Sequence, residues 1–266
     1  MREPDALDSV RVLALALLVR AGVGALIQAG SGVPAEVAGI LLEVGFLAVP
    51  LLYARVSGLA VFPSNGFARL PWKSAALVLV ASMGSMWILK GLSDLQMDLL
   101  SRLGIPTGAE VEQIARRVDQ ARSQGGSFAL AALVIAPALC EETLCRGLLF
   151  RGFARNFGAV RALIYTSLIF AALHLAIVQI VLMIFLGLFF GTVVRLTGSL
   201  WAGVLAHGVN NVGVLILTSF YGTRVELMRP PPLLLILSVA VFALALVLLA
   251  LESRATDPRG TPEAPR

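Results

Sequence analysis

The sequence is short of charged residues. Only 14% of its 266 residues are Asp, Glu, Lys or Arg, whereas 58% are hydrophobic. A soluble domain carries about 25% charged residues. The composition therefore argues against a soluble globular protein, and it is typical of a chain that crosses a membrane several times.

Cysteine and histidine are also scarce, with two residues of each. On one helix, the side chains of Cys140 and Cys145 diverge by about 140° and cannot bridge each other. We expect both thiols to be packing residues. The sequence contains no H-E-x-x-H, so that zinc-protease motif is excluded.

The net charge of +5 comes with arginines at the ends of apolar runs. Arginines in these places set the topology of a membrane protein and contact lipid headgroups. We therefore expect the lipid bilayer as a partner and no nucleic acid.

About eight apolar runs approach the roughly 20 residues that a membrane span needs. This pattern predicts an all-α fold, a polytopic membrane helical bundle in a single transmembrane domain over residues 1–252. Its motif-bearing core covers residues 128–217, and a proline-rich tail at 253–266 is expected to be disordered. The eight expected spans are residues 10–29, 35–55, 72–95, 128–150, 160–178, 179–196, 200–221 and 231–251.

The loop charges predict an orientation. An even number of spans places both termini on one side, and most arginines of the short loops fall on that side. The positive-inside rule then puts both termini in the cytoplasm. We expect an integral, multi-pass protein in the plasma membrane of a prokaryote.

Two further features lie outside the centre of the chain. Residues 109–122 have apolar side chains at helical spacing, which indicates an amphipathic helix that lies on the membrane surface or packs on the bundle. Arg20 and Glu43 lie at similar depth on either side of an expected turn at residues 30–32. We predict that they form a buried ion pair.

Three ionisable residues interrupt the fourth span: Glu141, Glu142 and Arg146. Each such group costs a few kcal/mol in hydrocarbon on insertion scales, and it usually faces a protein interior or an aqueous cavity. Glu142 and Arg146 are four residues apart and can pair along their helix. The segment is therefore a candidate functional site.

Both histidines fall where they can join this segment. Glu141 lies 16 residues before Phe157 in the next connection, and His174 lies 17 residues after it. On antiparallel helices these two residues reach about the same depth. His207 and Asn211 are four residues apart, so they share one face of the seventh span. The sequence thus permits one polar cluster on three helices.

Three short motifs contain these residues in order. They are E-E-x-x-x-R at Glu141, Glu142 and Arg146, F-x-x-x-H at Phe170 and His174, and H-x-x-x-N at His207 and Asn211.

In order and spacing, the motifs resemble those of the CAAX prenyl protease and bacteriocin-processing (CPBP, or Abi) family of intramembrane proteases. The resemblance covers about a third of the chain and implies peptide-bond hydrolysis within the membrane, on a membrane or lipidated peptide. It implies that Glu141 is the general base and that His174 helps to hold the water. His207 and Asn211 would donate hydrogen bonds to the oxyanion.

The same resemblance leaves Glu142 and Arg146 to orient the site or to bind a peptide carboxylate. No cofactor is expected. The main alternative is a zinc-dependent protease with Glu141, His174 and His207 as ligands. A non-proteolytic immunity or scaffold protein, a proton-relaying transporter and a purely structural polar network also stay open.

Overall fold

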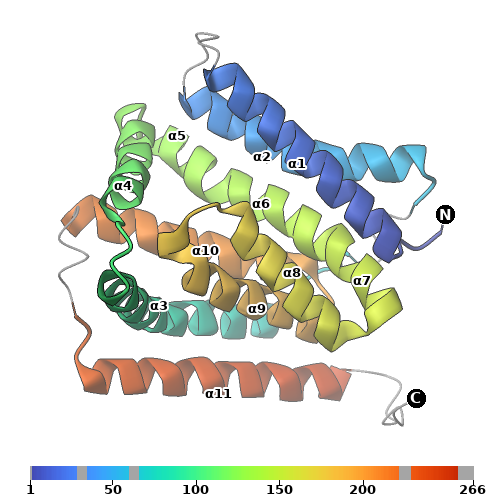
Figure 1. The fold of residues 1–266 in the computed structure, drawn as a ribbon. Coiled ribbons are helices and arrows are strands. Elements are labelled where there is room, and N and C mark those ends of the chain that lie inside the picture. Colours follow the sequence, from blue (N-terminus) through green and yellow to red (C-terminus); the bar gives the residue numbers. More distant parts are fainter. Residues whose placement is uncertain (1, 29–34, 60–65, 222–228, 257–266) are drawn as a thin grey trace.

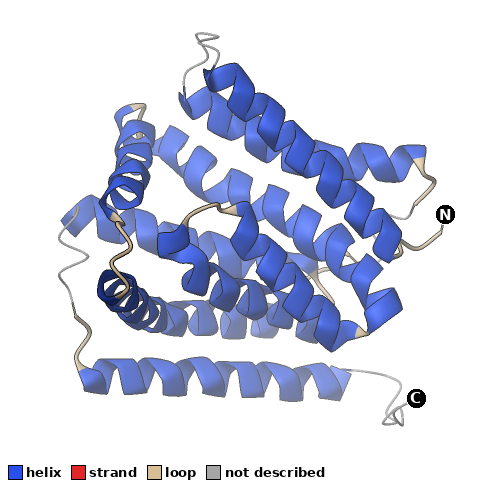
Figure 2. Ribbon diagram, in the orientation of Figure 1, coloured by secondary structure: helices blue, strands red, loops and turns tan. Residues whose placement is uncertain are grey.

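The fold is known from a computed structural model, which describes residues 2–28, 35–59, 66–221 and 229–256. This part of the chain is helical and contains no strand, apart from one isolated bridge between Arg2 and Leu59 (Figure 2). The predicted all-α class is confirmed. Figure 1 shows the helices as a bundle in which α1 (Ala6–Gln28) starts and α11 (Pro232–Thr256) ends on the same side.

Successive long helices run in opposite directions through the bundle. One long rod at the centre of the bundle runs from Gly126 to Phe157 and is built from five consecutive segments, in which α-helix alternates with π-helix. Its segments are α5 (Gly126–Leu130), η1 (Ala131–Ile135), α6 (Ala136–Glu142), η2 (Thr143–Leu149) and α7 (Phe150–Phe157). The remaining helices are α2 (Ala35–Val56), α3 (Trp72–Arg102), α4 (Gly108–Ser123), α8 (Ala159–Leu173), η3 (Ile177–Gln179), α9 (Ile180–Thr197) and α10 (Leu200–Tyr221).

Seven helices in the described part are long and apolar enough to cross a membrane, one fewer than the eight expected. The difference lies in the predicted span 160–178. Its helix, α8, has only 15 residues, about 22 Å of helix where a bilayer core needs about 30 Å. In Figure 1, α8 rises from the right and stops near the middle of the bundle. The chain turns there because Leu175 has a positive φ of 51°.

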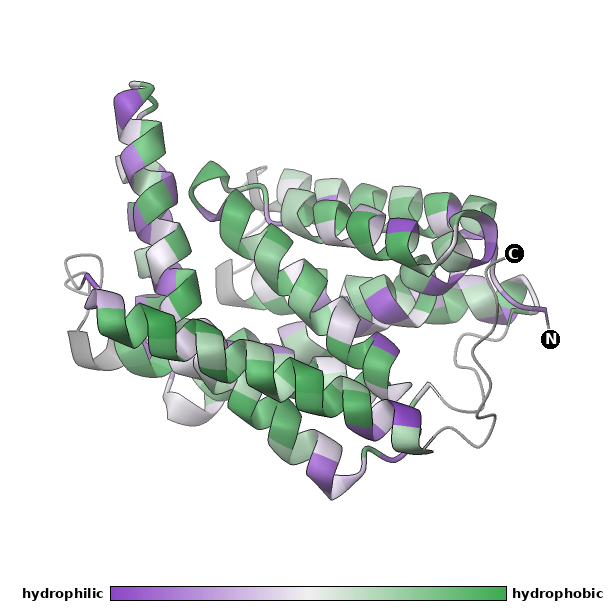
Figure 3. Ribbon diagram, turned by 90° about the horizontal axis from the view of Figure 1, so that it is seen from below, coloured by the Kyte–Doolittle hydropathy of each residue, from purple (hydrophilic) through white to green (hydrophobic). Residues whose placement is uncertain are grey.

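Hydrophobic side chains cover the outside of the bundle as well as its core. Figure 3 shows the long helices as mostly hydrophobic, with hydrophilic residues gathered towards helix ends. Many large apolar side chains are exposed, such as Leu18 and Leu233 at 67% each. A surface of this kind suits lipid and not water. The chain is therefore an integral, multi-pass membrane protein.

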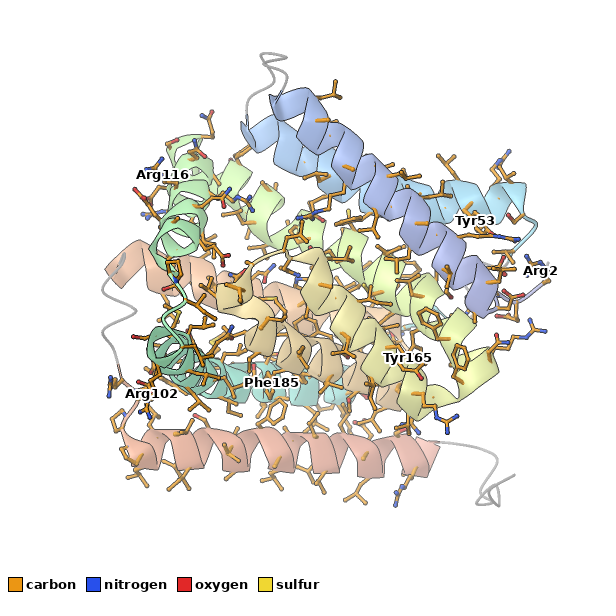
Figure 4. The ribbon with its side chains drawn as sticks, in the orientation of Figure 1. Arg2, Tyr53, Arg102, Arg116, Tyr165 and Phe185 are labelled. Carbon is orange, nitrogen blue, oxygen red and sulfur yellow. The ribbon has the colours of Figure 1, made fainter. Side chains whose placement is uncertain are left out.

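The two ends of the bundle carry different polar contacts. At the end where the chain begins, Asp8 accepts hydrogen bonds from Arg2 (2.6 and 2.8 Å) and from Tyr53 (2.8 Å), which joins α1 to α2. Figure 4 shows Arg2 and Tyr53 at this end, and Arg102 and Arg116 at the opposite one. Phe185 lies between α9 and α11, where its ring contacts Phe242 at 5.5 Å.

Helix α4 occupies the predicted amphipathic segment. It packs against α5, α2 and η3, and Ala121 is buried at 4% exposure. Most of its other residues are exposed. The helix predicted for this segment therefore forms, and it packs on the bundle.

The structure does not form the predicted ion pair between Arg20 and Glu43. None of the ion pairs in the described residues joins them, and Oε2 of Glu43 is buried without a hydrogen-bond partner. Glu43 interacts electrostatically with Glu141 as well as with Arg20. Matched depth fixes the height of a residue on its helix but not the direction in which its side chain points.

Two other expectations concern segments at the edge of what is described. The expected turn at residues 30–32 lies outside the described residues. Helix α11 continues to Thr256. The first four residues of the predicted tail 253–266 are therefore helical and extend the apolar helix by one turn. Residues 257–266 lie outside the described part.

Candidate active site

The polar centre of the molecule is the carboxylate of Glu142, which is fully buried. Its Oε1 accepts a hydrogen bond of 2.8 Å from Nη1 of Arg146. The predicted pair along the helix is therefore confirmed. The same oxygen lies 3.1 Å from Nδ1 of His207 on α10. Since a carboxylate accepts and the ring nitrogen donates, one oxygen joins the central rod to α10.

Arg146 is also enclosed on all sides, with 2% of its surface exposed. Its Nη2 donates to the carbonyl oxygen of Gly187 on α9 at 2.7 Å. Its guanidinium carbon lies 4.9 Å from the ring centre of Phe170 and 5.7 Å from that of Phe190. Cation–π contacts of this kind stabilise a desolvated arginine. Arg146 therefore links the central rod to α9 and packs against Phe170 of α8.

The winding of the central rod places these groups. Residues Thr143–Leu149 form a π-helical turn directly after the two glutamates, and Ala131–Ile135 form another before them. Such turns are rare and occur often at functional sites because they shift the direction of neighbouring side chains. Nδ2 of Asn211 donates a hydrogen bond of 3.0 Å to the carbonyl oxygen of Leu133, which lies in the π-helical turn Ala131–Ile135.

His174 follows directly after α8 and faces Glu141. Its Nδ1 lies 2.9 Å from the carbonyl oxygen of Phe170. A carbonyl only accepts, so Nδ1 carries the hydrogen and Nε2 is left with a lone pair in the neutral ring. Nε2 lies 4.0 Å from Oε2 of Glu141, and that oxygen is buried without a hydrogen-bond partner. The two atoms are too far apart for a direct hydrogen bond.

Phe170 lies between the two histidines of the site. Its ring centre is 4.9 Å from that of His174 and 5.9 Å from that of His207, and the side chain is 1% exposed. The imidazole of His207 stacks on Phe190 at 4.9 Å with an interplanar angle of 18°. Phe170 therefore packs against both histidines.

The structure brings the sequence-predicted residues into two adjoining groups. Glu141 faces His174, while Glu142 contacts Arg146 and His207. Asn211 contacts the same rod further towards its start, at Leu133, eight residues before Glu141. Its neighbour Asn210 points elsewhere, since it accepts from Ser85 at 2.9 Å and donates to Ala206 at 2.8 Å.

A zinc site requires about three ligands around one point. Among the residues that the structure describes, no three His, Cys, Asp or Glu side chains are grouped in this way. His207 directs Nδ1 to Glu142, whereas His174 faces Glu141. The side chains as placed do not fit the three-ligand alternative.

Sequence inspection missed the glycines that make room for the site. A Cβ on Gly203 would lie 2.8 Å from Oε2 of Glu142, and a Cβ on Gly187 would lie 2.8 Å from Cα of Ser167 on α8. Real Cβ atoms do not approach so closely. Both positions therefore require glycine, although glycine is common in membrane helices and gives no signal of its own.

Replacing Gly187 by alanine is expected to lower the free energy of unfolding by about 1–3 kcal/mol, because the backbones of α8 and α9 must move apart. Gly24→Ala is the matched control, since a Cβ there meets nothing within 4 Å. Thermal unfolding in detergent would measure both. Equal melting temperatures for the two variants would contradict the close contact.

Comparison with known proteins agrees with this site. Residues 123–213, about a third of the chain, match the family model described as Type II CAAX prenyl endopeptidase Rce1-like. The matched range includes every residue of the three motifs. Searches of curated proteins and of solved structures found no match. The match agrees with the resemblance carried by the three motifs: residues 123–213 are similar to the CAAX-type endopeptidases that this family model describes.

Proposed function

We propose that the protein hydrolyses a peptide bond in the membrane with a water molecule activated by Glu141. One observation carries the proposal. Oε2 of Glu141 and Nε2 of His174 are 4.0 Å apart and face each other, each with a free lone pair. A water oxygen about 2.8 Å from each atom fits between them and can donate one hydrogen to each.

In this arrangement the lone pairs of the water oxygen remain free to attack a carbonyl carbon. Glu141 takes a proton from the water as the new C–O bond forms. The proton then passes to the nitrogen of the leaving peptide as the C–N bond breaks. His174 holds the water and orients it, because its own Nδ1 hydrogen is fixed on the carbonyl of Phe170.

His207 and Asn211 are the proposed donors to the oxyanion. Nδ1 of His207 is engaged by Glu142, so the imidazole can donate from Nε2 only when both ring nitrogens carry hydrogen. Asn211 uses one amide hydrogen on Leu133 and keeps a second one. Donors preorganised in this way stabilise developing negative charge.

The surroundings support a substrate that lies in the bilayer. An apolar groove of about 900 Å³ runs between α3, the central rod and α10. Its wall includes Met83, Trp87, Leu139 and Gly208, and Lys90 is the charged residue that lines it. Leu139 and Glu141 lie on the same helix, two residues apart, so the groove adjoins the catalytic helix on a different face from Glu141. We assign the apolar part of a membrane or lipidated peptide to this groove.

The proposed orientation has both termini in the cytoplasm of a prokaryotic cell. It follows from the arginines of the short loops and from α1 and α11, which begin and end on one side of the bundle (Figure 1). A fluorescent reporter of cytoplasmic location fused to either terminus is expected to be active.

The cellular test compares membrane peptides by mass spectrometry in cells that carry the wild-type protein or Glu141→Gln. We expect cleavage products in wild-type cells that are absent with Glu141→Gln at equal expression. Identical peptide profiles together with an intact cellular phenotype would point to the non-proteolytic alternative.

A further inference from the structure

The connection between α8 and α9 holds one of the two groups that would bind water, and it is partly exposed, with Leu175 at 74% and Val178 buried. His174 is the first residue after α8, Leu175 has a positive φ, and Ala176 is extended. In Figure 1, this connection leaves α8 near the middle of the bundle. Backbone groups outside a helix are costly at membrane depth unless the protein satisfies them.

Gln96 on α3 satisfies two of these groups. Its Nε2 donates to the carbonyl oxygen of Ile177, and its Oε1 accepts from the amide of Val181 at 3.1 Å. The side chain of Gln96 is buried, at 4% exposure. Only a side chain that both donates and accepts can make this pair of bonds.

Glu110 on α4 satisfies a third group. Its Oε2 accepts a hydrogen bond of 3.2 Å from the amide of Val178. Helix α4 packs against η3 in this region. The peripheral amphipathic helix therefore contacts the same connection that carries His174 four residues earlier.

We propose that Gln96 and Glu110 are positioning residues for catalysis, which hold residues 174–181 so that His174 stays at its distance from Glu141. This inference rests on the proposed function of that pair. Neither residue touches the reacting atoms, and neither belongs to the three motifs. Helix α4 is thereby coupled to the catalytic centre, although it is not one of the spans.

Loss of Gln96 or Glu110 should affect turnover more than substrate binding. If the connection moves by about 1 Å, the water between His174 and Glu141 is misplaced, and misplacement on this scale costs up to about 100-fold in rate. The apolar groove lies on other elements, with walls from α3, the central rod and α10. Substrate binding there should change little.

The test uses the full chain in proteoliposomes with a membrane peptide that the wild type cleaves. Gln96→Met keeps the size of the side chain but removes both hydrogen bonds. We expect kcat to fall about 10- to 100-fold with KM within about twofold. Amide hydrogen exchange at residues 174–181 should accelerate at least about tenfold, while exchange in α10 is unchanged.

A second pair of variants separates loss of a hydrogen bond from misfolding of the buried site. Glu110→Ala should lower kcat by several-fold, whereas Glu110→Gln retains an acceptor and should restore it. Glu112→Ala is the matched control, because Glu112 is 64% exposed and pairs with Arg116 on the same helix. It should leave kcat unchanged.

Three outcomes would overturn the inference. They are unchanged kcat in Gln96→Met and Glu110→Ala, equal losses in Glu110→Ala and Glu112→Ala, or faster exchange in all helices alike. Wild type and Glu141→Gln are assayed in parallel. If both cleave equally, the proposed function fails, and the exchange measurement still reports whether Gln96 and Glu110 hold the connection.

Discussion

Replacing Arg146 by methionine is expected to lower the free energy of unfolding by about 3–5 kcal/mol, because it leaves a buried charge without its partner. Glu142 is fully buried and would lose the cation that lies 2.8 Å away. The carbonyl of Gly187 would lose its donor as well. Denaturation of the purified protein in mixed micelles would measure the loss.

The chain offers a control with the same geometry at the surface. Arg116 and Glu112 are also four residues apart and form an ion pair, with exposures of 71% and 64%. Arg116→Met should cost less than about 1 kcal/mol, since water solvates both charges. Equal losses in Arg146→Met and Arg116→Met would contradict the account of a buried structural pair.

A double variant separates the pair from its surroundings. Glu142→Gln with Arg146→Met removes both charges and should be more stable than Arg146→Met alone, because no unpaired charge is left behind. If the double variant is as unstable as the sum of the single ones, the two residues act independently.

Glu141→Gln is expected to lower kcat by about 10²–10⁴-fold, the range that a general base contributes. Glutamine keeps the size of the side chain but cannot take the proton from water. Melting temperature should change little, because Oε2 of Glu141 has no hydrogen bond to lose in the described structure. His174→Ala should lower kcat in the same direction.

Asn210→Ala provides a contrast on the neighbouring residue of the third motif. Asn210 bonds to Ser85 and Ala206 and takes no part in the proposed site. It should affect stability, with kcat of the folded protein retained. A structural polar network would instead make Glu141→Gln and His174→Ala lose stability together with activity.

Regular helix geometry made much of the site predictable from the sequence. A fixed rise per residue places Glu141 and His174 at the same depth, and spacings of four put Glu142 beside Arg146. The structure places both pairs as these distances require. The apolar composition likewise sufficed for the helical membrane fold.

Three features were not predictable in this way. The link between Glu142 and His207 depends on how α10 packs against the rod, which spacing along one helix does not determine. The direction of Arg20 and Glu43 around their helix axes was not known either, and the expected pair does not form. The early end of α8 has no turn signal in the sequence. The connection that follows it is held by Gln96, which lies 81 residues before Ile177 in the chain.

Hydrolysis by metal-depleted protein tests the central claim most directly. Purified wild-type protein is exhaustively treated with a chelator, checked for zinc by elemental analysis and assayed in proteoliposomes, with Glu141→Gln as the blank. The account predicts that the wild type keeps its rate without stoichiometric zinc and that Glu141→Gln forms no product. Full activity in Glu141→Gln, or loss on chelation that one equivalent of zinc restores, would contradict it.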